Sequence, residues 1–181
     1  MKILFLGDVV GIPGRSMVLN NLLSKINDEK IDFVVVNGEN AADSGVGLTE
    51  EICKDFFNCG VDVVTTGNHV WDQKETMSHI EKESRLLRPQ NLFEPSPGKG
   101  FGIFTAKNGA KVGVLNLMGN VFMKKCEDVF EAAEKFMKRY KFKEDYDFLL
   151  VDFHGETTSE KAAMGHFFDG KATLVVGTHT H

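Results

Sequence analysis

Short apolar runs alternate along this chain with longer segments whose apolar residues recur every three or four positions. Short apolar runs bounded by Gly or Asp are typical of buried strands, whereas the longer spacing is typical of helices that pack on a sheet. The first part of the chain reads in this way as strand, helix, strand, helix and strand. This order favours a parallel sheet, because parallel neighbours need a crossover segment between them.

The later part of the chain adds a β-hairpin, because the runs 101–105 and 111–117 are joined by K-N-G-A with an Asn-Gly turn at Asn108. The full set of expected strands is 2–6, 33–36, 61–65, 101–105, 111–117, 148–153 and 174–176. The expected helices open near Pro13, span 48–59, 74–83 and 129–140, and run through 168 after a Thr157–Glu160 capping box. The pattern predicts a layered α/β fold.

Composition narrows the class of protein. A chain of 181 residues that is 42% hydrophobic fits one domain, residues 1–181, with a sizeable core. The net charge of −5 disfavours nonspecific binding to DNA, RNA or anionic membranes. The opening M-K-I-L-F-L-G-D is too short for a signal peptide, and no stretch has the length of a membrane span. Three cysteines without C-x-x-C spacing favour a reducing cytoplasm.

The last expected strand runs into V-V-G-T-H-T-H, so two of the six histidines, His179 and His181, lie at its end. In extended backbone, residues two apart point to the same face of a sheet. We therefore expect these two imidazoles to converge on one point.

Polar residues follow the other strands in the same way. Functional residues of parallel sheets collect beyond the carboxyl ends of the strands, where the loops share one rim. The residues at these strand ends are Asp8, Glu39, Asn40, Asn68, His69, His154, His179 and His181. Oxygen and imidazole ligands without a thiolate suit iron, manganese or zinc, and they disfavour a structural zinc cage.

Each of these signals also has an ordinary structural explanation. An Asp after a strand is often a turn or helix cap, G-N is often a tight turn, and H-x-H often lies in a surface loop. The glycines of G-D-V-V-G-I-P-G do not have the G-x-G-x-x-G spacing of a dinucleotide site. His79 and His166 fall inside expected helices, so we interpret both as structural or solvent-facing. The joint placement at successive strand ends favours the metal-site hypothesis.

The order of these motifs resembles the calcineurin-like metallophosphoesterases, and specifically the bacterial YmdB-like phosphodiesterase family. The stretches that carry the resemblance include F-L-G-D-V-V-G-I-P-G-R, V-N-G-E-N-A-A, T-T-G-N-H-V-W-D, V-L-N-L-M-G-N-V-F-M, V-D-F-H-G-E-T-T-S-E-K and G-T-H-T-H. The resemblance covers the chain from Met1 to His181. It implies a metallophosphoesterase sandwich of mixed sheets flanked by helices. Family members continue past G-T-H-T-H, so it also implies that the last strands of that fold are absent here.

The resemblance further implies a binuclear centre, most often iron, with manganese and zinc as alternatives. One metal would be held by Asp8, Glu39, Asn40 and His181, and the other by Glu39, Asn68, His154 and His179, so that Glu39 bridges both. The wider superfamily has D-x-H after the first strand, but here Val10 stands at the His position and the Asn of G-E-N replaces it. Two cations about 3.5–4 Å apart need an anionic bridge, which Glu39 would supply.

The implied reaction is hydrolysis of small phosphodiesters, including 2′,3′-cyclic nucleotides, by a hydroxide shared between the metals. His69 would protonate the leaving oxygen or stabilise charge on the phosphoryl group. Two other functions stay open: a nonenzymatic regulator that uses the metal cleft, and a metal-free nucleotide-binding module. The sequence also leaves open whether the chain forms a homo-oligomer.

Overall fold

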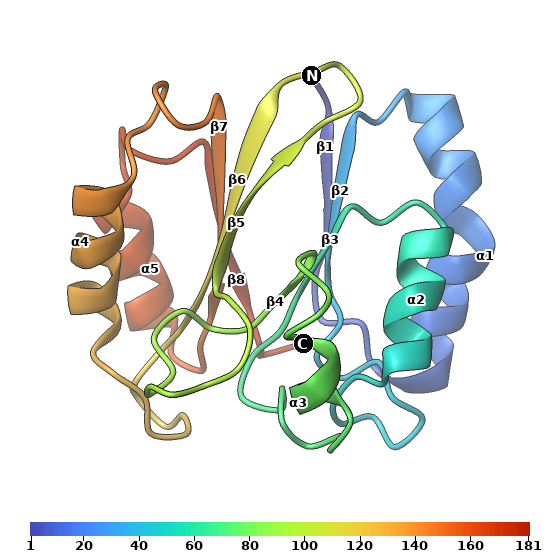
Figure 1. Cartoon of the computed structure of the whole chain (residues 1–181), viewed down its shortest axis with the longest axis horizontal. Helices are drawn as coiled ribbons and strands as arrows, with labels where there is room; N and C mark the ends of the chain where they lie inside the picture. Colours follow the sequence, from blue (N-terminus) through green and yellow to red (C-terminus); the bar gives the residue numbers. More distant parts are fainter.

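The computed structural model describes all residues from Met1 to His181 and has four layers. Two four-stranded sheets face each other in the middle, and helices cover the outer face of each sheet (Figure 1). One helical layer contains α1 (Gly11–Glu29) and α2 (Glu50–Asn58), and the other contains α4 (Val129–Arg139) and α5 (Thr158–Phe167). The expected layered α/β sandwich is confirmed.

The first sheet is entirely parallel, in the order β1-β2-β3-β4. Its strands are β1 (Ile3–Leu6), β2 (Phe33–Asn37), β3 (Val63–Thr65) and β4 (Leu86–Leu87). The second sheet has the order β5-β6-β7-β8, and only the β5–β6 pair is antiparallel. Its strands are β5 (Phe101–Thr105), β6 (Lys111–Met118), β7 (Phe148–His154) and β8 (Leu174–Thr178). The mixed character of the fold therefore lies in the second sheet, as the hairpin predicts.

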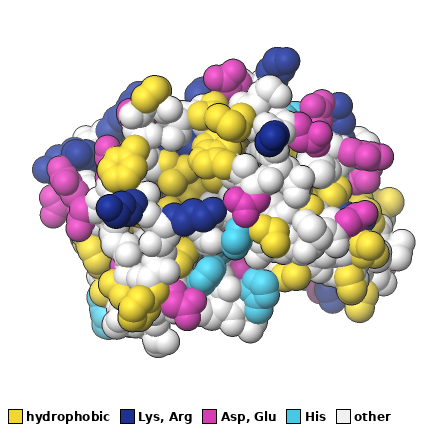
Figure 2. Space-filling view, turned by 90° about the horizontal axis from the view of Figure 1, so that it is seen from below, with side chains coloured by type: hydrophobic (Ala, Val, Ile, Leu, Met, Phe, Trp, Pro, Cys, Tyr) yellow, Lys and Arg dark blue, Asp and Glu magenta, His cyan; other side chains and the backbone are white.

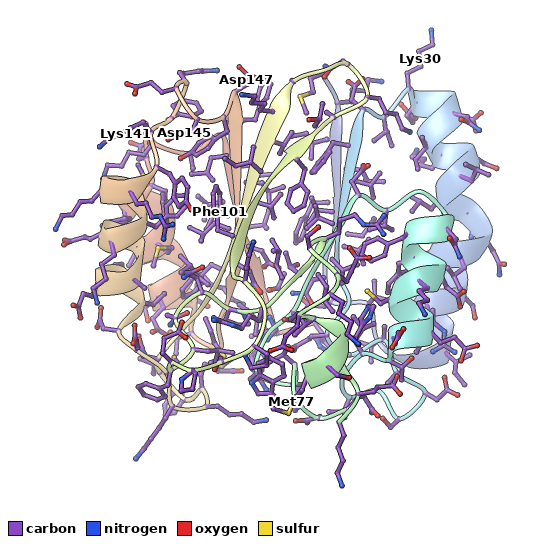
Figure 3. The ribbon with its side chains drawn as sticks, in the orientation of Figure 1. Lys30, Met77, Phe101, Lys141, Asp145 and Asp147 are labelled. Carbon is purple, nitrogen blue, oxygen red and sulfur yellow. The ribbon has the colours of Figure 1, made fainter.

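Apolar side chains fill each space between the layers. Phe33, Val112 and Leu150 belong to the buried cluster that joins the two sheets. A larger cluster packs α1 and α2 on the first sheet, and another packs α4 and α5 on the second. In the latter, the ring of Phe101 lies between β5 and α4 (Figure 3), with its centroid 4.8 Å from that of Phe136.

Local signals in the sequence set several boundaries as expected. The Thr49 hydroxyl accepts a hydrogen bond from the Ile52 N–H and caps α2, and Thr157 caps α5 in the same way through Glu160. Gly109 adopts φ +87° in the hairpin turn, a conformation that glycine reaches without strain.

One expectation needs correction, and one short strand was not expected. The helix expected at 74–83 is only the short α3 (Thr76–His79), because its segment is tied to the start of α2: the Thr76 hydroxyl donates to the Leu48 carbonyl, and the Glu75 carboxylate accepts from the Glu50 N–H. The two-residue strand β4 was not expected, because a run as short as L-L carries no periodicity.

None of the helices combines the length and apolar character needed to cross a bilayer.

Candidate metal centre

All eight candidate residues lie at one rim of the sandwich, where β1, β2, β3, β7 and β8 have their carboxyl ends. Figure 2 shows histidine and acidic side chains gathered on this lower face of the molecule. The two sheets meet there directly, because the Asp8 carboxylate after β1 accepts from the His179 N–H after β8, with distances of 2.9 and 3.1 Å. The shared rim therefore brings together residues that lie far apart in the sequence.

A tight group of four side chains forms the centre of this rim. Glu39 and His154 are fully buried, and their Oε1 and Nε2 atoms are 2.9 Å apart. The same His154 Nε2 lies 3.0 Å from Asn68 Oδ1 and 3.2 Å from His179 Nδ1. One ligand atom each from Glu39, His154 and His179 lies within 4.8 Å of the others, a spacing that suits a metal ion.

A buried hydrogen-bond chain orients the His154 ring. The Thr178 hydroxyl donates to Asp152 at 2.7 Å, so it accepts from His154 Nδ1, which is 2.9 Å away. Neutral His154 therefore presents the lone pair of Nε2 to the cluster, the arrangement that metal-ligating histidines usually have. Burial raises the pKa of Asp152, while donors on Thr65, Asn37 and Thr178 partly offset that effect.

A second group lies beside the first. The Asn40 amide nitrogen is 3.3 Å from Glu39 Oε1 and 3.4 Å from His181 Nε2. An isolated parallel bridge pairs Val10 with Asn40, so Asn40 lies next to the position where the wider superfamily has a histidine. Asn40 and His181 therefore lie together beside Glu39, whereas Asp8 contacts the backbone of His179.

The expectation that His179 and His181 converge on one point is wrong. Strand β8 ends at Thr178, and His179 and His181 adopt φ values of +101° and +31°. Because the backbone leaves the extended conformation, side chains two apart no longer share a face. His179 turns toward His154 and Glu156, whereas His181 lies beside Asn40.

The chemistry of the cluster fits a cation. With its proton on Nδ1, neutral His154 has no proton on Nε2 to share with Glu39, Asn68 and His179, whereas a metal ion could satisfy all of these lone pairs. The side-chain oxygen Oδ1 of Asn40 is buried without any hydrogen-bond partner, which is rare for a buried polar atom. These unsatisfied acceptors are what a metal site requires.

The protonation of the cluster follows from its surroundings. Burial raises the pKa of the Glu39 carboxyl, but the proximity of His154 and the hydrogen bond from the His69 N–H outweigh it, so the net pKa lies below its usual value. Burial and the neighbouring His154 ring lower the pKa of His179. Both shifts favour the forms that bind metals, an ionised carboxylate and a neutral imidazole.

His69 lies at the edge of the cluster, with its backbone N–H donating to Glu39 Oε2 at 3.2 Å. Its ring nitrogen Nδ1 lies 2.6 Å from Asp72, whose other carboxylate oxygen is 3.2 Å from the Lys124 ammonium. The His69 ring is partly exposed, so its free nitrogen Nε2 can reach a ligand from solvent.

The sequence reasoning missed the residues that support the ligands, namely Gly67, Asp72, Asp152, Glu156 and Thr178. Asp72 had a signal, because it ends the G-N-H-V-W-D motif one helical turn after His69. Asp152 and Thr178 read as polar residues inside apolar strands, where a buried polar partner is the usual explanation. His79 and His166 belong to α3 and α5: His79 is buried and His166 exposed.

A cavity of about 580 Å³ lies elsewhere, between β5, α4 and the segment 88–99. None of the candidate ligands lines it. The candidate centre is therefore separate from this cavity.

Gly67 allows the cluster to close. A Cβ atom at this position would overlap Glu39 Oε2 and His154 Nε2. We expect Gly67→Ala to weaken metal binding by about 10- to 100-fold, the usual effect of disturbing the surroundings of metal ligands. Metal titration of the variant tests this, with Gly165→Ala as the control because a Cβ there meets no atom within 4 Å. Equal affinities in the two variants would show that Gly67 is not required.

Known proteins resemble this chain over its full length. The sequence profile of the family described as "YmdB-like protein" matches residues 4–181. A 2′,3′-cyclic-nucleotide 2′-phosphodiesterase of Bacillus subtilis is 44% identical over 181 residues, which are 100% of this chain and 67% of that protein.

Two solved structures have the same fold. A hypothetical protein from Thermus thermophilus is 38% identical with a TM-score of 0.88, over 100% of this chain and 68% of the other. A phosphatase from Mycoplasma pneumoniae is 36% identical with a TM-score of 0.89, over 100% and 64%. The chain thus spans about two thirds of the length of these relatives. Together with the rim of carboxylate, amide and imidazole ligands, these matches show that the chain belongs to the YmdB-like family of metallophosphoesterases.

Proposed function

We propose that this protein is a metal-dependent phosphodiesterase that hydrolyses small phosphodiesters, 2′,3′-cyclic nucleotides in particular. The substrate class follows the name of the Bacillus subtilis relative at 44% identity. The observation that carries the proposal is the close grouping of ligand atoms from Glu39, His154 and His179, with the unpartnered side-chain oxygen Oδ1 of Asn40 on the residue after Glu39.

We assign two metal positions that share Glu39. Asp8, Asn40 and His181 would complete one, and Asn68, His154 and His179 would complete the other. Iron is our first choice, with manganese and zinc as alternatives, because all the donors are oxygen or imidazole nitrogen. When bound, a metal pair supplies an activated water and positive charge for the phosphoryl oxygens.

The chain's own groups would orient the substrate and move the proton. Asp72 accepts a hydrogen bond from His69 Nδ1, which fixes the ring and leaves Nε2 available. In its imidazolium form, His69 can donate the proton on Nε2 to the leaving oxygen of the ester. The Lys124 ammonium beside Asp72 adds positive charge where an anionic substrate would approach.

We also propose that residues 1–181 form one metallophosphoesterase domain, because each metal position draws ligands from both sheets. Neither sheet could then hold a metal alone. The three free cysteines favour a reducing compartment, and we place the protein in the cytoplasm.

Metal removal tests the proposal on the full-length protein. Hydrolysis of 2′,3′-cyclic AMP should disappear after chelation and return when manganese or iron is added, because the metals supply the nucleophile. His154→Ala should stay inactive after metal addition, whereas His166→Ala, which removes an exposed histidine from α5, should behave as wild type. Activity that survives complete metal removal would contradict the proposal, and metal-loaded protein without activity would favour a nonenzymatic regulator.

A further inference from the structure

The connection between β6 and α4, residues 119–128, lies at the same rim as the metal centre. Figure 1 shows it at the lower end of the sheets, toward which the chain end marked C also points. Its first residue, Gly119, donates from its N–H to the His154 carbonyl at 2.9 Å. Five residues later, the Lys124 ammonium contacts Asp72, the partner of His69. The segment 119–124 is therefore attached to the metal centre at both ends.

Hydrogen bonds hold this segment in one shape. The buried Glu160 carboxylate accepts from the Asn120 N–H at 2.8 Å and from the Val121 N–H at 3.2 Å. The Asn120 side chain accepts in turn from the Val129 N–H at the start of α4. The residue that follows Val121 is therefore preceded by two anchored backbone positions.

That residue is Phe122, and its state is unusual in two ways. Its side chain is 86% exposed, more than any other large apolar side chain of the protein. Its backbone has φ +61°, a conformation that is rare and strained for a bulky residue. Such strain persists only where the surroundings impose it, and it clusters at ligand-binding positions.

The position of Phe122 relative to the centre suits a nucleotide. Phe122 is three residues after Gly119, which bonds His154, and two residues before Lys124, which contacts Asp72. The length of the chain therefore limits the Cα of Phe122 to about 11 Å from that of Gly119 and about 7 Å from that of Lys124. In a nucleotide, a ribose separates the base from the phosphate. A ring near the metal centre, but outside it, can therefore meet the base while the phosphate is at the metals.

We propose that Phe122 is a stacking platform for the base of a nucleotide substrate. This inference rests on the proposed phosphodiesterase function and names a specificity-determining residue for it. Every base has a π face, so one phenyl ring accepts all four bases with little sequence preference. The exposed ring and the strained loop are then both explained by the ligand that covers them.

The test compares substrates with and without a base on the full-length, metal-loaded protein. Phe122→Ala should raise the KM for 2′,3′-cyclic AMP by about 5- to 100-fold, the usual weight of base stacking, and leave kcat nearly unchanged. The KM for methyl riboside 2′,3′-cyclic phosphate, which has no base, should not change. Phe122→Trp should keep the wild-type KM, and Leu23→Ala, at a 59% exposed position on α1, should do the same.

Other outcomes overturn the assignment. A KM that rises equally for both substrates would show that Phe122 shapes the loop rather than contacting the base. A lower melting temperature with unchanged KM values would assign it to packing instead. If the wild-type protein hydrolyses neither substrate, the proposed function fails by itself. Calorimetric titration with AMP and with ribose 5-phosphate then decides the inference: selective loss of AMP binding in Phe122→Ala supports it, and equal binding by both proteins overturns it.

Discussion

Glu39→Gln is expected to remove both metal ions at once and to abolish phosphodiester hydrolysis. Glu39 is the one anionic side chain common to both proposed ligand sets, and it is fully buried. Two cations about 3.5–4 Å apart repel each other strongly unless an anion lies between them. Glutamine keeps the size of the side chain but lacks the negative charge. Both metal positions then lose the anionic ligand that they share, so neither should be filled.

Elemental analysis alongside activity on the same sample measures this effect. The wild-type protein should carry about two metal ions per chain, and the variant should carry almost none. Asp62→Asn is the matched control, because it removes a half-buried carboxylate at the opposite end of the first sheet, where Asp62 accepts from the Val34 N–H. If Glu39→Gln retained one ion per chain, Glu39 would serve a single metal and the bridging assignment would be wrong.

The sequence predicts the fold and the rim because both follow from local patterns. Apolar runs that alternate with amphipathic helices specify parallel strands. The carboxyl ends of parallel strands lie at the same edge of the sheet, whatever the length and sequence of the loops. Asp8, Glu39 and His154 could therefore be assigned to one rim without any knowledge of their contacts. The capping residues Thr49 and Thr157 were predictable for the same reason, since each acts within its own helical turn.

What the sequence does not predict depends on contacts between distant segments. Asp152 and Thr178 belong to neighbouring strands, and only their pairing reveals the chain of hydrogen bonds that orients His154. The role of Gly67 is equally hidden, because the atoms that exclude a Cβ there come from β7 and from the loop after β2. The divergence of His179 and His181 was missed because strand periodicity was extended past the point where β8 ends.

His69→Ala should leave the metal content nearly intact and lower the turnover of 2′,3′-cyclic nucleotides by a factor on the order of 10²–10⁴, the usual contribution of a positioned proton donor. The ring is not part of the Glu39–His154–His179 cluster, and only its backbone N–H contacts Glu39, which alanine preserves. Asp72→Asn should cause a smaller loss, because asparagine can still accept from Nδ1 while the negative charge beside the ring is gone. The two variants together separate the proton donor from the group that orients it.

The leaving group decides whether His69 acts as an acid. A nitrophenolate departs without a proton, so the loss in His69→Ala should shrink on a nitrophenyl phosphodiester, whereas a ribose oxygen needs the proton and should show the full loss. Steady-state kinetics on both substrates, with metal content measured in parallel, gives this comparison directly. An equal loss on good and poor leaving groups would mean that His69 stabilises charge on the phosphoryl group instead. In that case Asp72, whose other oxygen contacts Lys124, would hold the positively charged imidazole beside the phosphoryl group, and it would have no part in a proton transfer.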